Sequence, residues 1–225
     1  MRFLCLHGIG SNSQTLEQQT AAIRYELGNQ HTYDFVEGTL PWESSMKNVL
    51  NMDDATFTFC DPDQPQSCRQ AAGDLERYIE EEGPFDGIIG FSMGATIALS
   101  WLVDWYRTKQ RDGTAVAPFK LAVFFSNARP PYDHAAWVAD RIAYLESAQM
   151  GARLDMPTAH IWGSADPQAE EAQRAVNFCD SERSSIFVHA KGHEIPISAE
   201  DTVSIAKVIN RAIHQSRGEI KATNC

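Results

Sequence analysis

Six short apolar runs, each rich in β-branched or aromatic residues and bounded by Gly, Pro or polar residues, most strongly constrain how this 225-residue chain can fold. Runs of this kind are typical of strands buried on both faces of a sheet. Longer segments with helical spacing of apolar residues lie between them. Alternating strands and helices predict an α/β protein with a mostly parallel six-stranded sheet and helices on both faces. The expected strands are 3–6, 33–36, 87–91, 121–125, 158–162 and 185–189, and the expected helices are 14–27, 68–82, 95–107, 169–178 and 199–214.

Two stretches interrupt this alternation. Residues 38–65 and residues 130–156 are both long for connections in a compact domain. The second stretch contains the segment 134–149, which we expect to form a helix and to act as a lid, because inserts on a rigid α/β scaffold usually shape the site. No linker separates two domains, so we expect one domain over residues 1–216 and a C-terminal tail over 217–225.

The sequence Gly90-Phe91-Ser92-Met93-Gly94 matches the pattern G-x-S-x-G. It ends an expected strand and precedes a helix-prone segment, which is the strand–turn–helix context of a nucleophile elbow. Such a turn lifts the serine hydroxyl off the sheet edge, and the two glycines let strand and helix approach closely. The pattern predicts that Ser92 is a nucleophile. The alternative is a tight turn with an incidental serine.

A serine hydroxyl is a weak nucleophile at neutral pH and needs a base in contact with it. Of the seven histidines, His193 directly follows the last expected strand, and catalytic groups gather at the carboxyl ends of parallel strands. His189 lies within that strand and is expected to pack against its neighbours. The base needs a carboxylate to fix its tautomer, and Asp166 follows the strand at 158–162. An Asp-Pro pair can also simply start a helix, but the order Ser92, Asp166, His193 is that of the α/β-hydrolase fold.

The turn His7-Gly8-Ile9-Gly10 follows the first expected strand. In the α/β-hydrolase fold, one oxyanion-hole donor is the backbone N–H after the nucleophile and another comes from a loop after an earlier strand. We therefore expect the amides of Met93 and Ile9 to hold the oxyanion, and His7 to organise the loop. A tight turn without a catalytic role is the alternative for residues 7–10.

Charge narrows the classes of partner. The chain has 19 Lys and Arg against 30 Asp and Glu, a formal net charge of -11. Neither nucleic acid nor an anionic membrane is expected as the main partner, because phosphate binding needs clustered cations. The local exception, Arg107 with Lys109 and Arg111, is interpreted as the solvated end of a helix or as a docking patch. The N-terminus lacks a signal-peptide pattern and no apolar run reaches membrane-spanning length, so a cytoplasmic location is expected.

The five cysteines are odd in number and scattered, and no pair has zinc-ligand spacing. Free thiols are therefore expected, although Cys60 and Cys68 lie close enough in the sequence to bridge a loop.

Together, these motifs resemble those of the fungal FSH-type serine hydrolases, a branch of the α/β-hydrolases, to about residue 214. The resemblance implies a triad of Ser92, Asp166 and His193, and esterase or thioesterase activity. Several members of this family resemble enzymes that work with polyketide synthases. Such enzymes release the acyl chain from a carrier protein. Met93 departs from the Gln that members often carry, and residues 126–129 replace an expected glycine-containing turn. The residues that carry the resemblance are Phe3-Leu4-Cys5-Leu6-His7-Gly8, Asp34-Phe35-Val36-Glu37-Gly38, Phe85-Asp86-Gly87-Ile88-Ile89-Gly90-Phe91-Ser92-Met93-Gly94 and Lys191-Gly192-His193-Glu194-Ile195-Pro196.

These observations predict a serine hydrolase that cleaves an acyl ester or thioester through an acyl-enzyme, with no metal or organic cofactor. The first hypothesis is a thioesterase that releases polyketide or other acyl chains from an acyl carrier protein or coenzyme A. The second is a small-ester carboxylesterase, and the third is a non-catalytic ligand-binding protein of the same fold. Trp42, Tyr132 and Trp137 are candidates for lining the acyl pocket, but ordinary core packing explains such aromatic residues equally well.

Overall fold

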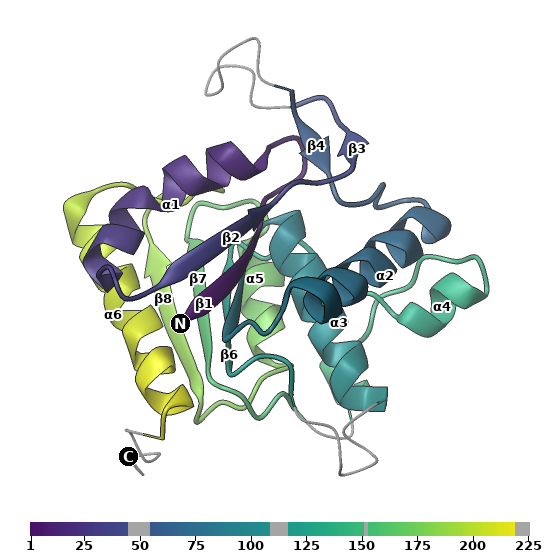
Figure 1. Ribbon diagram of the computed structural model, residues 1–225. Coiled ribbons are helices and arrows are strands. Elements are labelled where there is room, and N and C mark those ends of the chain that lie inside the picture. Colours follow the sequence, from purple (N-terminus) through teal and green to yellow (C-terminus); the bar gives the residue numbers. More distant parts are fainter. Residues whose placement is uncertain (45–54, 109–116, 151–152, 219–225) are drawn as a thin grey trace.

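The computed structural model describes residues 1–44, 55–108, 117–150 and 153–218, and its centre is a six-stranded sheet (Figure 1). Every neighbouring pair of strands in this sheet is parallel, and the strand order is β2-β1-β5-β6-β7-β8. The predicted sheet is thereby confirmed, and it is parallel throughout. The strands are β1 (Arg2–Leu6), β2 (Thr32–Val36), β5 (Gly87–Phe91), β6 (Leu121–Phe125), β7 (Thr158–Gly163) and β8 (Ser184–His189).

Two hydrophobic layers cover the sheet because successive side chains of a strand point to opposite faces. On β1, Phe3 and Cys5 pack into one layer, and Leu4 and Leu6 pack into the other. The first layer includes side chains of α1 (Ser13–Leu27) and α6 (Ala199–Ser216). The second includes side chains of α2 (Pro65–Glu82), α3 (Met93–Thr108) and α5 (Ala169–Val176). Helices therefore lie on both faces, as the alternating pattern predicted (Figure 1).

The expected lid helix over residues 134–149 is wrong. The structure has a short helix α4 (His134–Val138) and a 3-10 turn η2 (Ser147–Gln149) instead. Asp140 adopts a left-handed φ of 54°. The Arg141 N–H donates to the Ala136 carbonyl at 3.0 Å and the Asp140 N–H donates to the Trp137 carbonyl at 3.1 Å. These two bonds form a Schellman closure, which ends the helix after little more than one turn.

The first of the two long stretches, residues 38–65, contains a small second sheet. The sequence did not predict this sheet, because each of its two strands is only two residues long. They are β3 (Leu40–Pro41) and β4 (Phe57–Thr58), which pair antiparallel. Phe57 exchanges backbone hydrogen bonds with the loop after β1, since it accepts from the Gly10 N–H at 2.9 Å and donates to the Ser11 carbonyl at 2.7 Å. The insert is thereby attached to the loop that carries Ile9.

Several further sequence predictions concern the cysteines, the basic patch, the C-terminal tail and membrane-spanning segments. Cys5, Cys60, Cys68 and Cys179 are free and buried, as expected. Within the expected docking patch, Arg107 lies 3.5 Å from an Asp133 carboxylate oxygen, whereas Lys109 and Arg111 lie outside the described residues. The same holds for residues 219–225 of the expected tail, and the division into one domain and a tail stays a prediction. In the part of the chain that the structure describes, no helix has the length and apolar character needed to cross a membrane.

Candidate active site

Ser92 occupies a sharp turn between β5 and α3. Its φ is 54°, a left-handed value that is uncommon for a residue other than glycine. Two backbone hydrogen bonds hold the turn: the Ser92 N–H donates to the Phe125 carbonyl at 2.9 Å, and the Thr96 N–H donates to the Ser92 carbonyl at 3.0 Å. The strand–turn–helix of a nucleophile elbow is therefore present, with the serine held in a strained backbone conformation.

The two glycines of the motif are required by close backbone contacts. A Cβ atom on Gly90 would lie 2.5 Å from the Cα atom of Ala95 at the start of α3. A Cβ atom on Gly94 would lie 2.2 Å from the Leu6 carbonyl oxygen and 2.5 Å from the His7 carbonyl oxygen. Only glycine permits these contacts, so the motif lets the turn sit against both its own helix and the end of β1.

The Ser92 hydroxyl belongs to a chain of hydrogen bonds with side chains from two other loops. His193 Nε2 lies 2.8 Å from Ser92 Oγ, and His193 Nδ1 lies 2.8 Å from Asp166 Oδ2. Because a carboxylate can only accept, Nδ1 carries a proton and Nε2 is left to accept from the hydroxyl. The Asp166 side chain is fully buried, whereas 27% of the His193 side chain is exposed. The structure thus brings together the three residues that the sequence predicted, in an arrangement that can deprotonate the serine.

Asp166 and His193 are held in register by contacts between their loops. The Ser164 N–H donates to the His189 carbonyl at 2.7 Å, and the Ala165 N–H donates to the Lys191 carbonyl at 3.1 Å. Between the loops lies Gly163, at the end of β7, where a Cβ atom would be only 2.0 Å from the Lys191 carbonyl oxygen. The sequence did not predict that Gly163 matters for the site. The only local feature that could have indicated it is its position three residues before Asp166.

The loop after β1 lies directly against the serine. A Cβ atom on Gly8 would be 3.2 Å from the Ser92 Cβ atom and 3.1 Å from the Phe91 ring. Gly10 bends the loop with a left-handed φ of 66°. Within the described part of the chain, neither the Ile9 nor the Met93 amide donates to another protein group. The assignment of these two amides to the oxyanion hole stays a prediction.

The turn after β6 departs from the glycine-containing one that family members are expected to carry. Ser126 takes the left-handed conformation itself, with φ of 43°, and its N–H donates to the Ile161 carbonyl at 2.7 Å. Asn127 braces the turn by donating to the Arg129 carbonyl at 2.6 Å. A short polar residue in place of glycine is thus accommodated by this backbone.

The aromatic residues predicted to contact substrate lie in different surroundings. Tyr132 and Trp137 are buried in the core, with 1% and 6% of their surfaces exposed, and their ring centroids are 5.4 Å apart. Trp42 is half-buried beside β3. Core packing accounts for Tyr132 and Trp137 as the structure stands, and substrate contact by all three stays a prediction.

A cavity of about 160 Å³ lies at the carboxyl ends of β1 and β2, beside α2 and α3. Glu37 and Phe59 line it and also contact His7, which directly precedes Gly8. The cavity is therefore a neighbour of the loop that lies on Ser92. Its walls are mostly apolar, and the polar residues Glu37, Thr39 and Asp74 also line it. The apolar lining residues include Leu6, Val36, Phe59, Ala71, Leu75 and Ile97. Among the described residues, no group of three or more His, Cys, Asp or Glu side chains is placed to hold a metal ion.

A parallel sheet with an elbow serine that is hydrogen-bonded through a histidine to a buried aspartate defines a serine hydrolase of the α/β-hydrolase fold. Solved structures of this chain's fold include a carboxylesterase from Mesorhizobium loti, with a TM-score of 0.60 at 15% identity over 93% of this chain and 88% of that one. SOBER1 from Arabidopsis thaliana has a TM-score of 0.58 at 16% identity over 95% of this chain and 99% of that one.

The chain belongs to the family described as serine hydrolase (FSH1), whose model matches residues 1–205. It is 34% identical to the esterase FPY3 of Fusarium mangiferae over 223 residues, which cover 95% of this chain and 99% of that protein. It is 33% identical to the hydrolase phiM of Fungal sp. (strain ATCC 74256) over 219 residues, which cover 96% of this chain and 94% of that protein. The predicted family and fold are thereby confirmed.

Proposed function

We propose that this protein hydrolyses acyl esters or acyl thioesters through an acyl-enzyme on Ser92. The observation that carries the proposal is the pair of 2.8 Å hydrogen bonds that join Ser92, His193 and Asp166. A buried carboxylate that orients an imidazole, which in turn contacts a strained serine, is the arrangement that activates serine nucleophiles on several unrelated folds.

In the acylation step, His193 Nε2 takes the proton from Ser92 Oγ as that oxygen attacks the substrate carbonyl carbon. Asp166 stabilises the imidazolium that forms. The Ile9 and Met93 amides donate to the oxyanion of the tetrahedral intermediate, and each such donor contributes about 2.7–4 kcal/mol of transition-state stabilisation. When the intermediate collapses, the bond to the alcohol or thiol breaks and His193 protonates the leaving group.

In the deacylation step, water enters and attacks the acyl carbonyl. His193 takes a proton from the water, the same two amides hold the second oxyanion, and the proton passes to Ser92 Oγ as the carboxylic acid leaves. The partial exposure of the His193 side chain supports this step, because water must reach Nε2. The cycle requires no metal or organic cofactor.

The cavity beside the oxyanion loop is the proposed site for the acyl part of the substrate. A protein cavity of about 150 Å³ with apolar walls is large enough to bind benzene, so this one can hold a short chain or a ring. The names of the esterases FPY3 and FUS5 support an ester substrate. A thioester substrate is proposed only from what the family resemblance implies. With a net charge of -11, the chain offers an acidic carrier protein no general attraction, so a carrier would depend on local contacts.

Matched substrates separate these possibilities. Esters and thioesters with the same acyl chain, including a carrier-bound thioester, are compared by kcat/KM, with Ser92→Ala as the control for background hydrolysis. The proposal expects turnover of at least one class and loss of that turnover in Ser92→Ala. A large advantage for short esters would overturn the thioesterase form, and the absence of turnover with every substrate would favour the non-catalytic alternative.

The acyl site has a separate test. Ala71 lines the cavity from α2, and Ala71→Leu adds three carbon atoms to its wall. We expect kcat/KM for long acyl chains to fall relative to acetyl esters, whereas Gly73→Ala on the same helix, which meets no atom within 4 Å, leaves that ratio unchanged. An unchanged ratio in Ala71→Leu would place the acyl chain elsewhere.

A further inference from the structure

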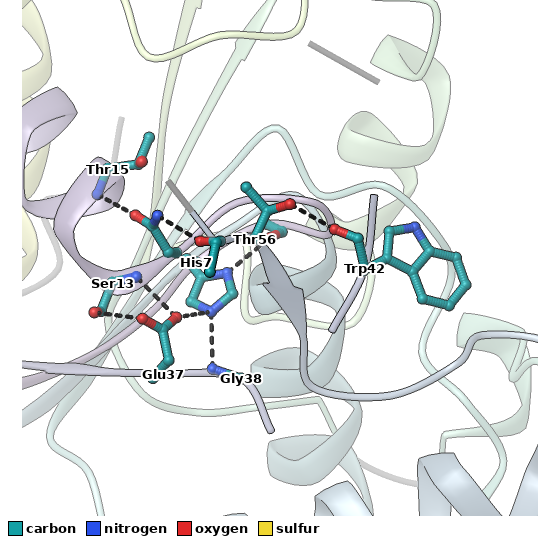
Figure 2. Close-up of polar contacts among 10 residues, drawn as sticks. His7, Ser13, Thr15, Glu37, Gly38, Trp42 and Thr56 are labelled. Atoms are coloured by element: carbon teal, nitrogen blue, oxygen red, sulfur yellow. Dashed lines mark hydrogen bonds and ion pairs between the residues drawn. The ribbon is translucent and has the colours of Figure 1, made fainter. Parts of the chain in front are cut away.

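His7 is fully buried beside the oxyanion loop, and both of its ring nitrogens have backbone partners (Figure 2). Nδ1 lies 2.8 Å from the Gly8 carbonyl oxygen, and Nε2 lies 2.9 Å from the Gly38 backbone nitrogen. A carbonyl can only accept and a backbone N–H can only donate. These two partners therefore select one form of the ring, the neutral imidazole with its proton on Nδ1.

The environment of the ring agrees with this neutral form. Burial lowers the pKa of His7, and this effect outweighs the opposing influence of the Gly8 carbonyl and of Glu37. Glu37 Oε1 lies 2.9 Å from Nε2, where it would accept from a protonated Nε2, and the same carboxylate accepts from the Ser13 N–H and hydroxyl, each at 3.0 Å. Nδ1 carries a proton both in the neutral form that burial favours and in the charged form that Glu37 favours, so the bond to Gly8 is present in either form. Figure 2 shows the carboxylate between Ser13 and the ring. The ring is therefore fixed by the end of β2 on one side and by Gly8 on the other.

The bond to Gly8 has a consequence for the next amide in the chain. The Gly8 carbonyl and the Ile9 N–H belong to one peptide unit, which is trans and planar, so the two groups point in opposite directions. When Nδ1 holds the carbonyl, the orientation of the Ile9 N–H is set as well, away from the buried ring. This same peptide unit begins at Gly8, where an added Cβ atom would lie 3.2 Å from the Ser92 Cβ atom.

We propose that His7 is a positioning residue for the hydrolysis reaction, which holds the Gly8 carbonyl and thereby orients the Ile9 amide toward the oxyanion. This inference rests on the proposed function. His7 touches neither the substrate nor the reacting atoms. Without the bond to Nδ1, the Gly8–Ile9 peptide can rotate about its flanking single bonds, which the glycine at position 8 makes easy.

Two substitutions of His7 form a matched pair. In His7→Asn, the side-chain amide can place its NH₂ where Nδ1 lies and donate to Gly8, whereas in His7→Gln the longer side chain reaches the place of Nε2 and loses the donor to Gly8. Each variant gives up one of the two ring bonds, so both are expected to lose comparable stability. We expect kcat of His7→Gln to fall by about 100- to 1000-fold, the effect of losing one oxyanion donor, with KM within a few-fold of the parent. His7→Asn should keep kcat within about tenfold.

A purely structural role predicts a different result, in which both variants lose activity in proportion to their loss of stability in urea unfolding. Equal kcat values for the two variants would overturn the inference. Ser92→Ala in the same assay separates a failure of the proposed function from a failure of the proposed role of His7. If Ser92→Ala is as active as the parent, the proposed function fails, whereas an inactive Ser92→Ala with a fully active His7→Gln overturns only the role of His7.

A measurement on the unaltered protein keeps the inference testable if either variant fails to fold. The nitrogen chemical shifts of isotope-labelled histidine report which ring nitrogen carries the proton. We expect His7 to be neutral with its proton on Nδ1 at neutral pH. A proton on Nε2 alone would leave Nδ1 unable to donate to Gly8 and would overturn the inference.

Discussion

Gly163→Ala tests whether the contact between the loop after β7 and the loop after β8 positions Asp166 and His193 for their proposed catalytic roles. The added methyl group would lie 2.0 Å from the Lys191 carbonyl oxygen and 2.4 Å from the Gly192 carbonyl oxygen, whereas Cβ atoms essentially never come closer than 3.0 Å to such atoms. The loops must therefore separate by about 1 Å, the difference between 3.0 and 2.0 Å. Because a displacement of about 1 Å can cost a factor of about 100, we expect kcat/KM to fall about 100-fold, or about 2.7 kcal/mol in the activation barrier.

The assay is steady-state hydrolysis of an activated ester. Gly73→Ala is the matched control, since the same methyl group there meets no atom within 4 Å and replaces a glycine inside a helix. That control should keep full activity and gain about 0.5–1 kcal/mol in the free energy of unfolding.

A double-mutant cycle refines the test. Asp166→Asn should cost a smaller factor in the Gly163→Ala background than in the parent, because the displaced loops have already weakened the Asp166–His193 contact. Activity of Gly163→Ala within about threefold of the parent, or an equal cost of Asp166→Asn in both backgrounds, would refute the reasoning.

Two further predictions concern stability, measured by urea unfolding. The Asn12 side chain caps α1 by accepting from the Thr15 N–H at 2.7 Å, and its NH₂ also donates to the Ala55 carbonyl at 3.0 Å. Asn12→Ala loses both bonds and Asn12→Ser can keep the cap, so Asn12→Ala should cost about 1 kcal/mol more than Asn12→Ser; equal costs would argue against the cap. Burial lowers the pKa of His160 from 6.5 to about 3, so the unfolded chain binds the extra proton between these pH values and stability falls as the pH drops through that window. In His160→Gln, the slope of the free energy of unfolding against pH should decrease by up to about 1.4 kcal/mol per pH unit near pH 5, and an unchanged slope would contradict the assignment.

The parts of the fold that were predictable from the sequence have local signals. The runs at 87–91 and 121–125 are apolar at every position, which only strands buried on both faces require, and the structure has β5 and β6 at the same bounds. Ser92 was predictable because the pattern G-x-S-x-G stands between an apolar strand and a helix-prone segment, and Gly90 is required by a contact with Ala95 inside that same strand–turn–helix unit, although Gly94 is required by the end of β1.

The wrongly predicted helix and the missed residues have different causes. The segment after His134 is rich in helix-forming residues, but the closure at Asp140 ends α4, and no glycine marks that position. Gly163 matters because of Lys191, which is distant in the sequence, and the partners of His7 Nε2 come from the end of β2. Such contacts arise only when the sheet is assembled, so no local pattern reveals them.

The central claim is that Ser92 carries the acyl group during turnover. The direct measurement is mass spectrometry of the protein quenched in acid during hydrolysis of an activated ester, followed by peptide mapping. The account predicts one added acyl group on the peptide that contains Ser92, and no adduct or turnover with Ser92→Ala. An acyl group on a different residue, or turnover by Ser92→Ala at the rate of the parent, would contradict it.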